Sequence, residues 1–303
     1  MKEKWTFWID CGGTFTDIIA VSDAGTHKVH KLLSKSPHYK SVVAQGIEDL
    51  LGHTNFKESI KELRLGTTIA TNAFLEKNGI PCALATTLGH RDLLEIKQQN
   101  RPDLFAIDIK KNRPLYREVT HIQERIDAKG NILTPLDLEI AQFELQRILD
   151  KGIKSLAISL MHATLNPVHE IKLKDLAIKM GFDYVSTSHE ICPIAKYISR
   201  TETTVIDSYL TPFLQQYTSE LSKLLGIDNI YYMQSDGSLC LGENLKGHSA
   251  LLSGPAGGLI GAIKAAKDKG IDKIITFDMG GTSTDAALCH GDLGVFQTET
   301  DFL

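Results

Sequence analysis

Residues 10–17 place two carboxylates, two adjacent glycines and two threonine hydroxyls within eight positions, in the order Asp-Cys-Gly-Gly-Thr-Phe-Thr-Asp. The adjacent glycines permit a sharp turn with positive φ at no steric cost, and they let backbone N–H groups approach a ligand closely. Successive N–H groups in such a turn form a concave anion site, to which the threonine hydroxyls add donors. An aspartate ahead of the glycines suits a water-mediated contact with Mg²⁺. These residue types therefore predict a site for Mg²⁺ and phosphate.

A second segment near the other end of the chain repeats the first. Residues 278–285 read Asp-Met-Gly-Gly-Thr-Ser-Thr-Asp, and six of the eight positions match. The matched residues are Asp10 with Asp278, Gly12 with Gly280, Gly13 with Gly281, Thr14 with Thr282, Thr16 with Thr284 and Asp17 with Asp285. We interpret the pair as an internal duplication. One copy alone is equally typical of an ordinary hairpin that uses glycine for its geometry, whereas two copies favour turns that hold the phosphates of a nucleotide from both sides.

A third glycine-rich loop, Ser-Gly-Pro-Ala-Gly-Gly at residues 253–258, comes directly before a helical stretch at residues 259–267. The free N–H groups and the dipole at a helix N-terminus attract anions. Such a loop is a weak signal alone, and its place between the two repeats strengthens it. We predict that Asp10 and Asp278 are catalytic and also orient Mg²⁺. The predicted nucleotide-binding residues are Gly12, Gly13, Thr14, Thr16, Asp17, Gly254, Gly257, Gly258, Gly280, Gly281, Thr282, Ser283, Thr284 and Asp285.

Two further stretches are candidates for substrate contacts. Residues 66–72, Gly-Thr-Thr-Ile-Ala-Thr-Asn, follow an apolar run and precede a helix-forming stretch, and ligands bind at such strand ends in α/β folds. A helix-capping role for the threonines explains the same residues equally well. Two arginines lie in charged stretches without a clear period, where they either hold a substrate carboxylate or form surface ion pairs with Asp92 and Asp103. The predicted substrate residues are Thr67, Thr68, Asn72, Arg91 and Arg101.

The apolar spacing predicts the elements that position these residues. It favours helices at residues 41–51, 134–151 and 166–180, and a near-continuous apolar run at residues 153–161 predicts a buried parallel strand. This alternation of strands and helices indicates an α/β lobe with layers of both elements. His162, His169 and Glu170 fall in the same region. They have no third ligand at a metal-like spacing, so we expect ordinary polar roles for them.

A connecting stretch at residues 188–200 contains a proline, and we place the boundary between two lobes there. The first domain is then residues 1–190 and the second is residues 191–303, each with one copy of the repeated segment. The second begins with a long helix at residues 201–225, which Pro212 is expected to interrupt.

Composition excludes several classes of protein. The 303 residues are 42% hydrophobic and 23% charged, as in a soluble globular protein, and the net charge of −4 gives no basic field for nucleic acid. The five cysteines are scattered and odd in number, which argues against a disulfide framework and favours a reducing cytoplasm. The N-terminus has too short an apolar run for a signal peptide, and the sequence has no membrane-length apolar stretch.

Six segments together resemble the hydantoinase/oxoprolinase family, specifically the N-terminal portion of its A-type subunit. They are residues 10–17, 66–72, 101–103, 233–237, 253–258 and 277–285. The resemblance implies an α/β, duplicated actin-like (ribonuclease H-like) ATPase fold, with two lobes of mixed sheet and flanking helices. It also implies ATP and Mg²⁺ as cofactors, a small cyclic amide of hydantoin, 5-oxoproline or lactam type as substrate, and a B-type hydantoinase subunit as partner.

The sequence departs from the family pattern in three ways. Cys11 stands where an aliphatic residue or threonine is more usual, and His90 where the family tends to have phenylalanine. Family members continue well beyond Leu303, with a later glycine-rich segment that is expected to seat the adenosine. We therefore expect an incomplete second lobe, as in a fragment, a split gene or a degenerate protein, with the phosphate site present and the adenine site missing.

The leading functional hypothesis is an ATP-dependent hydrolase of cyclic amides that activates the amide by phosphoryl transfer. One alternative is a subunit of an ATP-dependent ketone carboxylase, or a small-molecule kinase of the same fold. The other is a non-catalytic nucleotide-binding fragment. Residues 66–72 and 101–103 favour the first hypothesis over a kinase.

Overall fold

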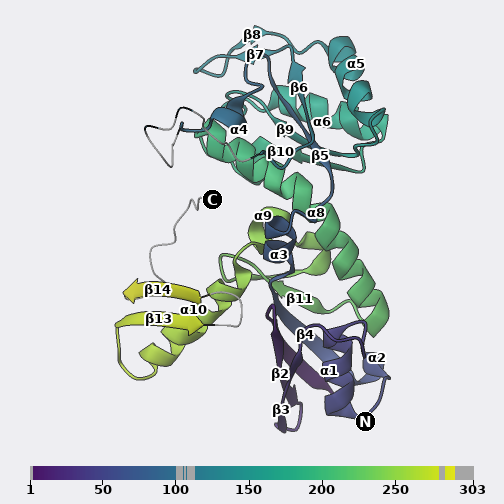
Figure 1. Cartoon of the computed structure of the whole chain (residues 1–303), viewed down its shortest axis with the longest axis vertical. Coiled ribbons are helices and arrows are strands. Elements are labelled where there is room, and N and C mark those ends of the chain that lie inside the picture. Colours follow the sequence, from purple (N-terminus) through teal and green to yellow (C-terminus); the bar gives the residue numbers. More distant parts are fainter. Residues whose placement is uncertain (1–2, 100–104, 106, 108–112, 280–283, 291–303) are drawn as a thin grey trace. The chain divides into compact units, whose positions relative to one another are not determined.

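A computed structural model describes residues 3–99, 105, 107, 113–279 and 284–290 (Figure 1). The chain forms two compact units: unit 1 comprises residues 1–76 and 214–303, and unit 2 comprises residues 77–213. These units are defined by contacts in space, and unit 1 combines two separate stretches of the chain. The division of the sequence into domains at residues 1–190 and 191–303 stays a prediction. None of the described helices combines the length and the apolar character that crossing a membrane would require.

Unit 1 is built on a six-stranded mixed sheet in the order β12-β11-β4-β1-β2-β3. The strands are β1 (Trp5–Cys11), β2 (Phe15–Ser22), β3 (His27–Leu33), β4 (Ile60–Thr67), β11 (Ile230–Met233) and β12 (Leu239–Leu241). Strand β1 runs antiparallel to β2 and parallel to β4. It therefore joins the first glycine turn, at one end of β1, to the segment that follows β4.

The sheet of unit 1 has one buried face and one open face. Phe7 and Ile9 are buried, whereas Trp8 and Asp10, which alternate with them, are exposed, because successive side chains of a strand point to opposite faces. The helices of unit 1 are α1 (Val42–Leu51), α2 (Phe56–Ser59), α3 (Ile69–Leu75), η1 (Gly242–Asn244), α9 (Gly247–Ala250), α10 (Ser253–Lys267) and the second half of α8 (Tyr197–Leu225). Helix α1 packs so closely on β2 that a Cβ at Gly46 would lie 2.1 Å from Ile18 Cδ1.

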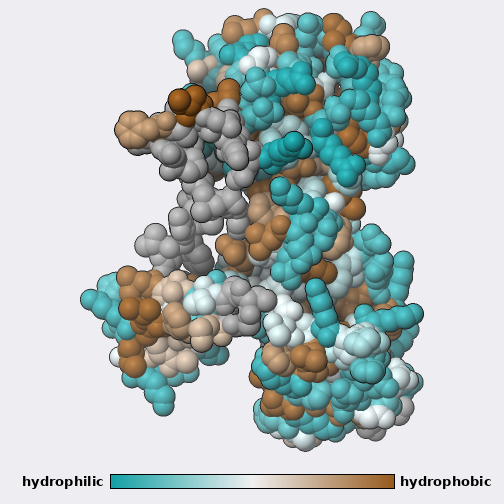
Figure 2. All heavy atoms as spheres, viewed as in Figure 1, coloured by the Kyte–Doolittle hydropathy of each residue, from teal (hydrophilic) through white to brown (hydrophobic). Residues whose placement is uncertain are grey.

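The second repeat also forms two antiparallel strands, β13 (Lys273–Met279) and β14 (Thr284–His290). Asp278 pairs with Asp285, as Asp10 pairs with Asp17 in the first repeat. The two strands predicted for each repeat are therefore confirmed, in the same register. The apolar positions differ in burial, because Phe277 is 70% exposed whereas its counterpart Ile9 is 3% exposed. Figure 2 shows hydrophobic side chains gathered on this hairpin.

Unit 2 contains a four-stranded parallel sheet in the order β10-β9-β5-β6 and a two-stranded sheet of β7 and β8. Its strands are β5 (Cys82–Thr87), β6 (Glu118–Ile122), β7 (Arg125–Ile126), β8 (Ile132–Thr134), β9 (Ser155–Ser159) and β10 (Tyr184–Thr187). Its helices are α4 (Leu93–Ile96), α5 (Leu138–Leu149), α6 (Val168–Met180), α7 (Ser188–Ile191) and the first half of α8. Every residue of β9 is buried, as the apolar run at residues 153–161 predicts.

Two helix boundaries in unit 2 differ from the sequence prediction. Thr134 ends β8, and the following helix begins after Asp137, whose carboxylate accepts hydrogen bonds from the N–H groups of the first turn. Helix α8 is not interrupted at Pro212 but runs through it. Proline has no N–H to donate to the carbonyl of Ser208 four residues earlier. The hydroxyl of Ser155 donates to that carbonyl instead, at 2.6 Å, so the sheet supplies the hydrogen bond that the helix loses.

The different burial of the two repeats predicts different responses to the same truncation. Replacing buried Ile9 with alanine is expected to lower the free energy of unfolding of unit 1 by about 2–5 kcal/mol, because it removes packed methyl groups. Replacing exposed Phe277 with alanine is expected to change it by no more than about 0.5 kcal/mol. Both tryptophans of the chain lie in β1, so tryptophan fluorescence during urea denaturation reports on unit 1. Equal losses in the two variants would contradict this difference.

Candidate nucleotide site

The turn of the first repeat joins β1 to β2 and is closed by a hydrogen bond from Gly12 N–H to Phe15 O, at 3.0 Å. The expectation of positive φ is wrong, because neither Gly12 nor Gly13 is among the residues with positive φ. Space is the reason for glycine here, since a Cβ at Gly12 would lie 2.9 Å from Phe15 O. In the part of the chain that the structure describes, the N–H groups of Gly13 and Thr14 make no hydrogen bond. They are the turn's available donors for an anion.

Ser34, directly after β3, braces this turn from one side. Its N–H donates to Thr14 O at 2.8 Å, and its hydroxyl donates to Gly12 O at 2.6 Å. Thr16 is fully buried, and its hydroxyl lies 3.0 Å from that of Ser34. Thr16 therefore supports the turn from within the sheet. The sequence prediction did not include Ser34, and its pairing follows only from how β3 returns along β2.

The segment at residues 66–72 lies against the same turn. In the register of β1 and β4, Gly66 pairs with Asp10, and a Cβ at Gly66 would lie 3.3 Å from Asp10 Oδ1. Thr68 donates to Cys11 O through its N–H at 3.2 Å and through its hydroxyl at 3.3 Å. The Asn72 side-chain amide donates to the Thr68 hydroxyl at 3.3 Å. Asn72 therefore orients Thr68, and Thr68 ties the start of α3 to the end of β1.

The third glycine-rich loop is joined to this segment by two hydrogen bonds. The N–H of Leu252, which precedes α10 with φ 58°, donates to the Thr71 hydroxyl at 3.4 Å, and the Ser253 hydroxyl donates to Thr67 O at 3.3 Å. Thr71 thus holds α10 and does not cap α3. Thr67 accepts from Ile69 N–H at 3.2 Å, as the capping alternative requires. Helix α10 begins at Ser253 and not at the predicted residue 259, so Gly254 lies in its first turn and Gly257 and Gly258 lie in its second. Unit 1 thus joins the first glycine turn, residues 66–72 and the start of α10 by hydrogen bonds.

Asp10 is exposed at the end of β1, but the protein around its carboxylate changes its ionisation. Partial burial of the carboxylate, then the negative charges of Asp17 and Asp278, raise the pKa of Asp10 above its ordinary value, and the charge of Lys31 opposes this rise. Burial likewise raises the pKa of the Cys11 thiol, to about 12, so this cysteine stays a neutral thiol beside the turn.

Several of the predicted site residues do not belong to the first glycine turn or to the segments that contact it. Thr284 and Asp285 form the first positions of β14. Arg91 belongs to unit 2 and makes no ion pair within the described residues, so the surface pair with Asp92 is absent there. Five predicted residues lie outside the described part of the chain: Arg101, Gly280, Gly281, Thr282 and Ser283.

The buried acidic and histidine side chains of unit 2 hold the fold together, as expected. Glu170 is fully buried and accepts hydrogen bonds from Leu160 N–H at 2.8 Å and from the Ser188 hydroxyl at 2.6 Å. Its other oxygen lies 2.6 Å from His189 Nδ1, and His169 Nδ1 lies 2.7 Å from Glu124 Oε2. These contacts link the carboxyl ends of the strands to the helices that follow them.

The described residues contain no group of three or more histidine, cysteine, aspartate or glutamate side chains that could hold a metal ion. Mg²⁺ does not need such a cage, because it keeps several waters and binds through one or two carboxylates plus substrate phosphates. The Asp10 carboxylate fits this need. It is exposed beside the turn, and the repulsion from Asp17 and Asp278 is relieved by a bound cation.

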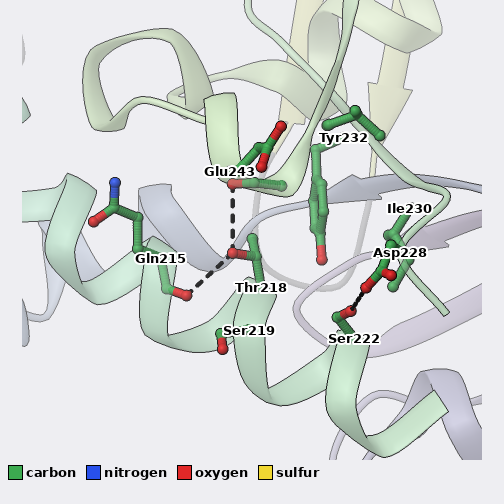
Figure 3. A pocket seen from close by; sticks show the side chains of 10 residues that line it. Gln215, Thr218, Ser219, Ser222, Asp228, Ile230, Tyr232 and Glu243 are labelled. Atoms are coloured by element: carbon green, nitrogen blue, oxygen red, sulfur yellow. Dashed lines mark hydrogen bonds between the residues drawn. The ribbon is translucent and has the colours of Figure 1, made fainter. Parts of the chain in front are cut away.

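A cavity of about 430 Å³ lies in unit 1 between the second half of α8 and the strand edge of the sheet (Figure 3). Ile230 and Tyr232 form part of its wall. Both are buried and pair with Leu63 and Leu65, so they point to the buried face of the sheet, opposite to Asp10. The cavity therefore contains none of the predicted site residues and is separate from the nucleotide site.

Two family models together match most of the chain. Residues 6–181 match the model of the hydantoinase/oxoprolinase N-terminal region, and residues 200–301 match the hydantoinase/oxoprolinase model. The chain belongs to the hydantoinase/oxoprolinase family. The resemblance drawn from the six sequence segments is thereby confirmed.

Its curated relatives in this family are longer proteins. The chain is 39% identical to 5-oxoprolinase 1 of Arabidopsis thaliana, over 96% of this chain and 26% of that protein. It is 32% identical to the caprolactamase subunit alpha of Pseudomonas jessenii, over 100% of this chain and 46% of that protein. The chain thus spans between about a quarter and a half of the length of these two relatives.

Solved structures confirm the fold class. The ATP-dependent caprolactamase from Pseudomonas jessenii superposes with a TM-score of 0.81 at 30% identity, over 93% of this chain and 43% of that one. A nucleotide-free acetone carboxylase superposes with a TM-score of 0.77 at 24% identity, over 95% and 44%, and this likeness shows the fold alone. The α/β fold of the actin-like ATPase type, with helices flanking the sheets, is therefore the fold of this family member. Of the two main sheets, that of unit 1 is mixed, as expected, whereas that of unit 2 is parallel.

The electrostatics of the turn predict an unusual titration of Asp10. Its pKa is expected to lie above about 3.9, the ordinary aspartate value, and Asp17→Asn is expected to lower it by removing a negative neighbour and releasing Lys31. Because the folded-state pKa is raised, Asp10 contributes stability below about pH 3.9 that is lost as the pH rises through the raised value. Carboxyl ¹³C shifts, followed by NMR as the pH is varied, measure the pKa of Asp10 in the unaltered chain and in Asp17→Asn. A wild-type Asp10 that titrates at the ordinary value would contradict this electrostatic account.

Proposed function

We propose that this chain is the ATP-binding, A-type portion of an ATP-dependent hydrolase of cyclic amides of hydantoin, 5-oxoproline or lactam type. The observation that carries the proposal is the pair of hairpins in unit 1, with Asp10 opposite Asp17 and Asp278 opposite Asp285. The family supports the substrate class, since its named relatives include 5-oxoprolinases and a caprolactamase subunit. The caprolactamase is described as ATP-dependent, which supports ATP as the nucleotide.

In this proposal the nucleotide phosphates lie between the two glycine turns. The N–H groups of Gly13 and Thr14 donate to phosphate oxygens, and Gly12 lets the phosphates approach because it has no Cβ. The second turn, Gly280, Gly281, Thr282 and Ser283 with Thr284 and Asp285, acts in the same way from the other side. The start of α10, with Gly254, Gly257 and Gly258, adds the positive end of a helix dipole.

Asp10 and Asp278 would hold Mg²⁺ through its waters, and Mg²⁺ when bound supplies charge neutralisation for phosphoryl transfer. Thr16 and Asp17 keep the first hairpin in place. The γ-phosphoryl group passes from ATP to the amide oxygen, and ADP leaves. Water then adds to the activated ring carbon and the ring C–N bond breaks, which leaves an acyl phosphate on the opened chain. A second water hydrolyses this acyl phosphate, and phosphate is released with the opened amino acid. The protein's part is mainly positioning and charge stabilisation.

Substrate contacts are proposed for Thr67, Thr68 and Asn72 beside the hairpin, and for Arg91 and Arg101, each of which can bind a carboxylate through two hydrogen bonds. The subunit name of the caprolactamase relative supports an enzyme of more than one subunit. We propose a B-type hydantoinase subunit as the partner that completes hydrolysis.

Nucleotide binding tests the first step. Asp10→Ala and Asp278→Ala are each expected to weaken Mg·ATP binding by about tenfold or more, because each removes a carboxylate that holds the metal-bound waters. Binding of ATP without Mg²⁺ is expected to change much less. Isothermal titration calorimetry measures both, and Asp23→Ala, an exposed aspartate of the same unit, is the control. Unchanged Mg·ATP affinity in both site variants means that the carboxylates are misassigned.

Product analysis tests the reaction type. The chain combined with a B-type subunit is expected to release ADP, phosphate and the ring-opened acid in equal amounts from 5-oxoproline or a lactam. Accumulation of a phosphorylated product without ring opening would favour the kinase alternative, and bicarbonate-dependent consumption of a ketone would favour the carboxylase. Nucleotide binding with no turnover of any of these substrates would favour a non-catalytic fragment.

A further inference from the structure

A row of three charged side chains crosses the open face of the sheet beside the glycine turn. Asp10 on β1 pairs with Asp17 on β2, and Asp17 pairs with Lys31 on β3. All three residues occupy the same level of the sheet, and side chains at one level of adjacent strands point to the same face. Lys31 is thus placed in the charged row of the proposed nucleotide site, although no sequence motif marks it.

The ammonium group of Lys31 is held at a defined place. It donates to both carboxylate oxygens of Asp17, at 2.9 and 2.8 Å. It also lies 5.3 Å from the centroid of the Phe15 ring, a distance at which a cation is attracted by an aromatic face. Phe15 directly follows Thr14, so the Lys31 side chain leans from its own level toward the turn. Its side chain is 57% exposed, which leaves the ammonium accessible to a ligand.

The charges around the turn require a cation. Asp10 and Asp17 lie opposite each other on neighbouring strands, and the ammonium of Lys31 bonds to Asp17 from the third strand. A nucleoside triphosphate brings several more negative charges to the same place. Carboxylates alone would repel it, so the site needs positive charge from the protein as well as from a metal ion.

We propose that Lys31 is a phosphate-binding residue of the nucleotide site, with Asp17 as the residue that positions its ammonium. An ammonium has three N–H donors; two are directed at Asp17, and the third binds a phosphate oxygen of the nucleotide. The inference rests on the proposed function, because it takes a nucleoside polyphosphate as the ligand. It adds β3 to the two glycine turns as a part of the protein that forms the site: Lys31 binds phosphate, and Ser34, directly after β3, supports the first turn.

A matched ion pair elsewhere in unit 1 gives the control. Lys61 donates to Asp23 at 2.9 Å, and these side chains are 58% and 51% exposed, against 57% and 53% for Lys31 and Asp17. Exposed pairs of this kind contribute little to stability, so neither lysine is needed for folding. The two pairs differ in their place, since only Lys31 leans toward the glycine turn.

The test compares Lys31→Met, Lys31→Arg and Lys61→Met in the full chain by isothermal titration calorimetry with Mg·ATP, tripolyphosphate and adenosine. Lys31→Met is expected to weaken binding of Mg·ATP and tripolyphosphate by about 10- to 100-fold, the loss typical of one charge-assisted hydrogen bond. Lys31→Arg is expected to retain most of the affinity, and Lys61→Met all of it. Adenosine binding is expected to be the same in every variant.

The outcomes separate this inference from the proposed function. If the unaltered chain binds Mg·ATP and Lys31→Met binds it equally well, the inference is overturned and the nucleotide site stands. If Lys31→Met weakens adenosine and Mg·ATP equally, Lys31 is structural and the inference is again overturned. If the unaltered chain binds neither Mg·ATP nor tripolyphosphate, the proposed function fails and takes the inference with it. Circular dichroism and tryptophan fluorescence establish that each variant is folded.

Discussion

The parallel pairing of β1 with β4 is the constraint on which the candidate site depends. Its register sets Asp10 against Gly66, where the space for a side chain is so small that a Cβ would lie 3.3 Å from the carboxylate. The same pairing carries Thr68 to the carbonyl of Cys11 and, through Thr71, fixes the residue that precedes α10. A shift of one residue would turn the Asp10 side chain to the buried face and separate the first glycine turn from residues 66–72 and the start of α10.

The sheet divides structural and chemical work between its two faces. The buried face holds Phe7, Ile9 and Ile18, and the cavity beside α8 opens on that face. The open face carries the charged row of Asp10, Asp17 and Lys31. Asp10 and Asp17 can lie close together on the open face despite their repulsion, because the packing that stabilises the unit lies on the buried face. A bound metal ion would relieve this repulsion. The second hairpin repeats the paired aspartates, and its negative charge reaches Asp10.

The sequence was most informative where a local pattern determines local geometry. The repeated segments predicted both hairpins, and the apolar run at residues 153–161 predicted the buried strand β9. It was less informative where the local structure depends on a residue that is distant in the sequence. Ser34 meets the turn only because β3 returns along β2, and Ser155 lets α8 continue through Pro212 by hydrogen bonding to the Ser208 carbonyl. Gly12 was predicted correctly as a turn residue, but steric space and not positive φ explains it. The roles of the individual site residues stay predictions.

We propose that the first glycine turn and its neighbouring segments bind nucleotide phosphates. A crystal structure of the chain with a non-hydrolysable Mg·ATP analogue tests it most directly. We expect phosphate oxygens within about 3.2 Å of the N–H groups of Gly13 and Thr14, with the metal's waters bound to Asp10. Phosphates bound elsewhere, for example in the cavity beside α8, with the turn left in contact with solvent alone, would contradict it.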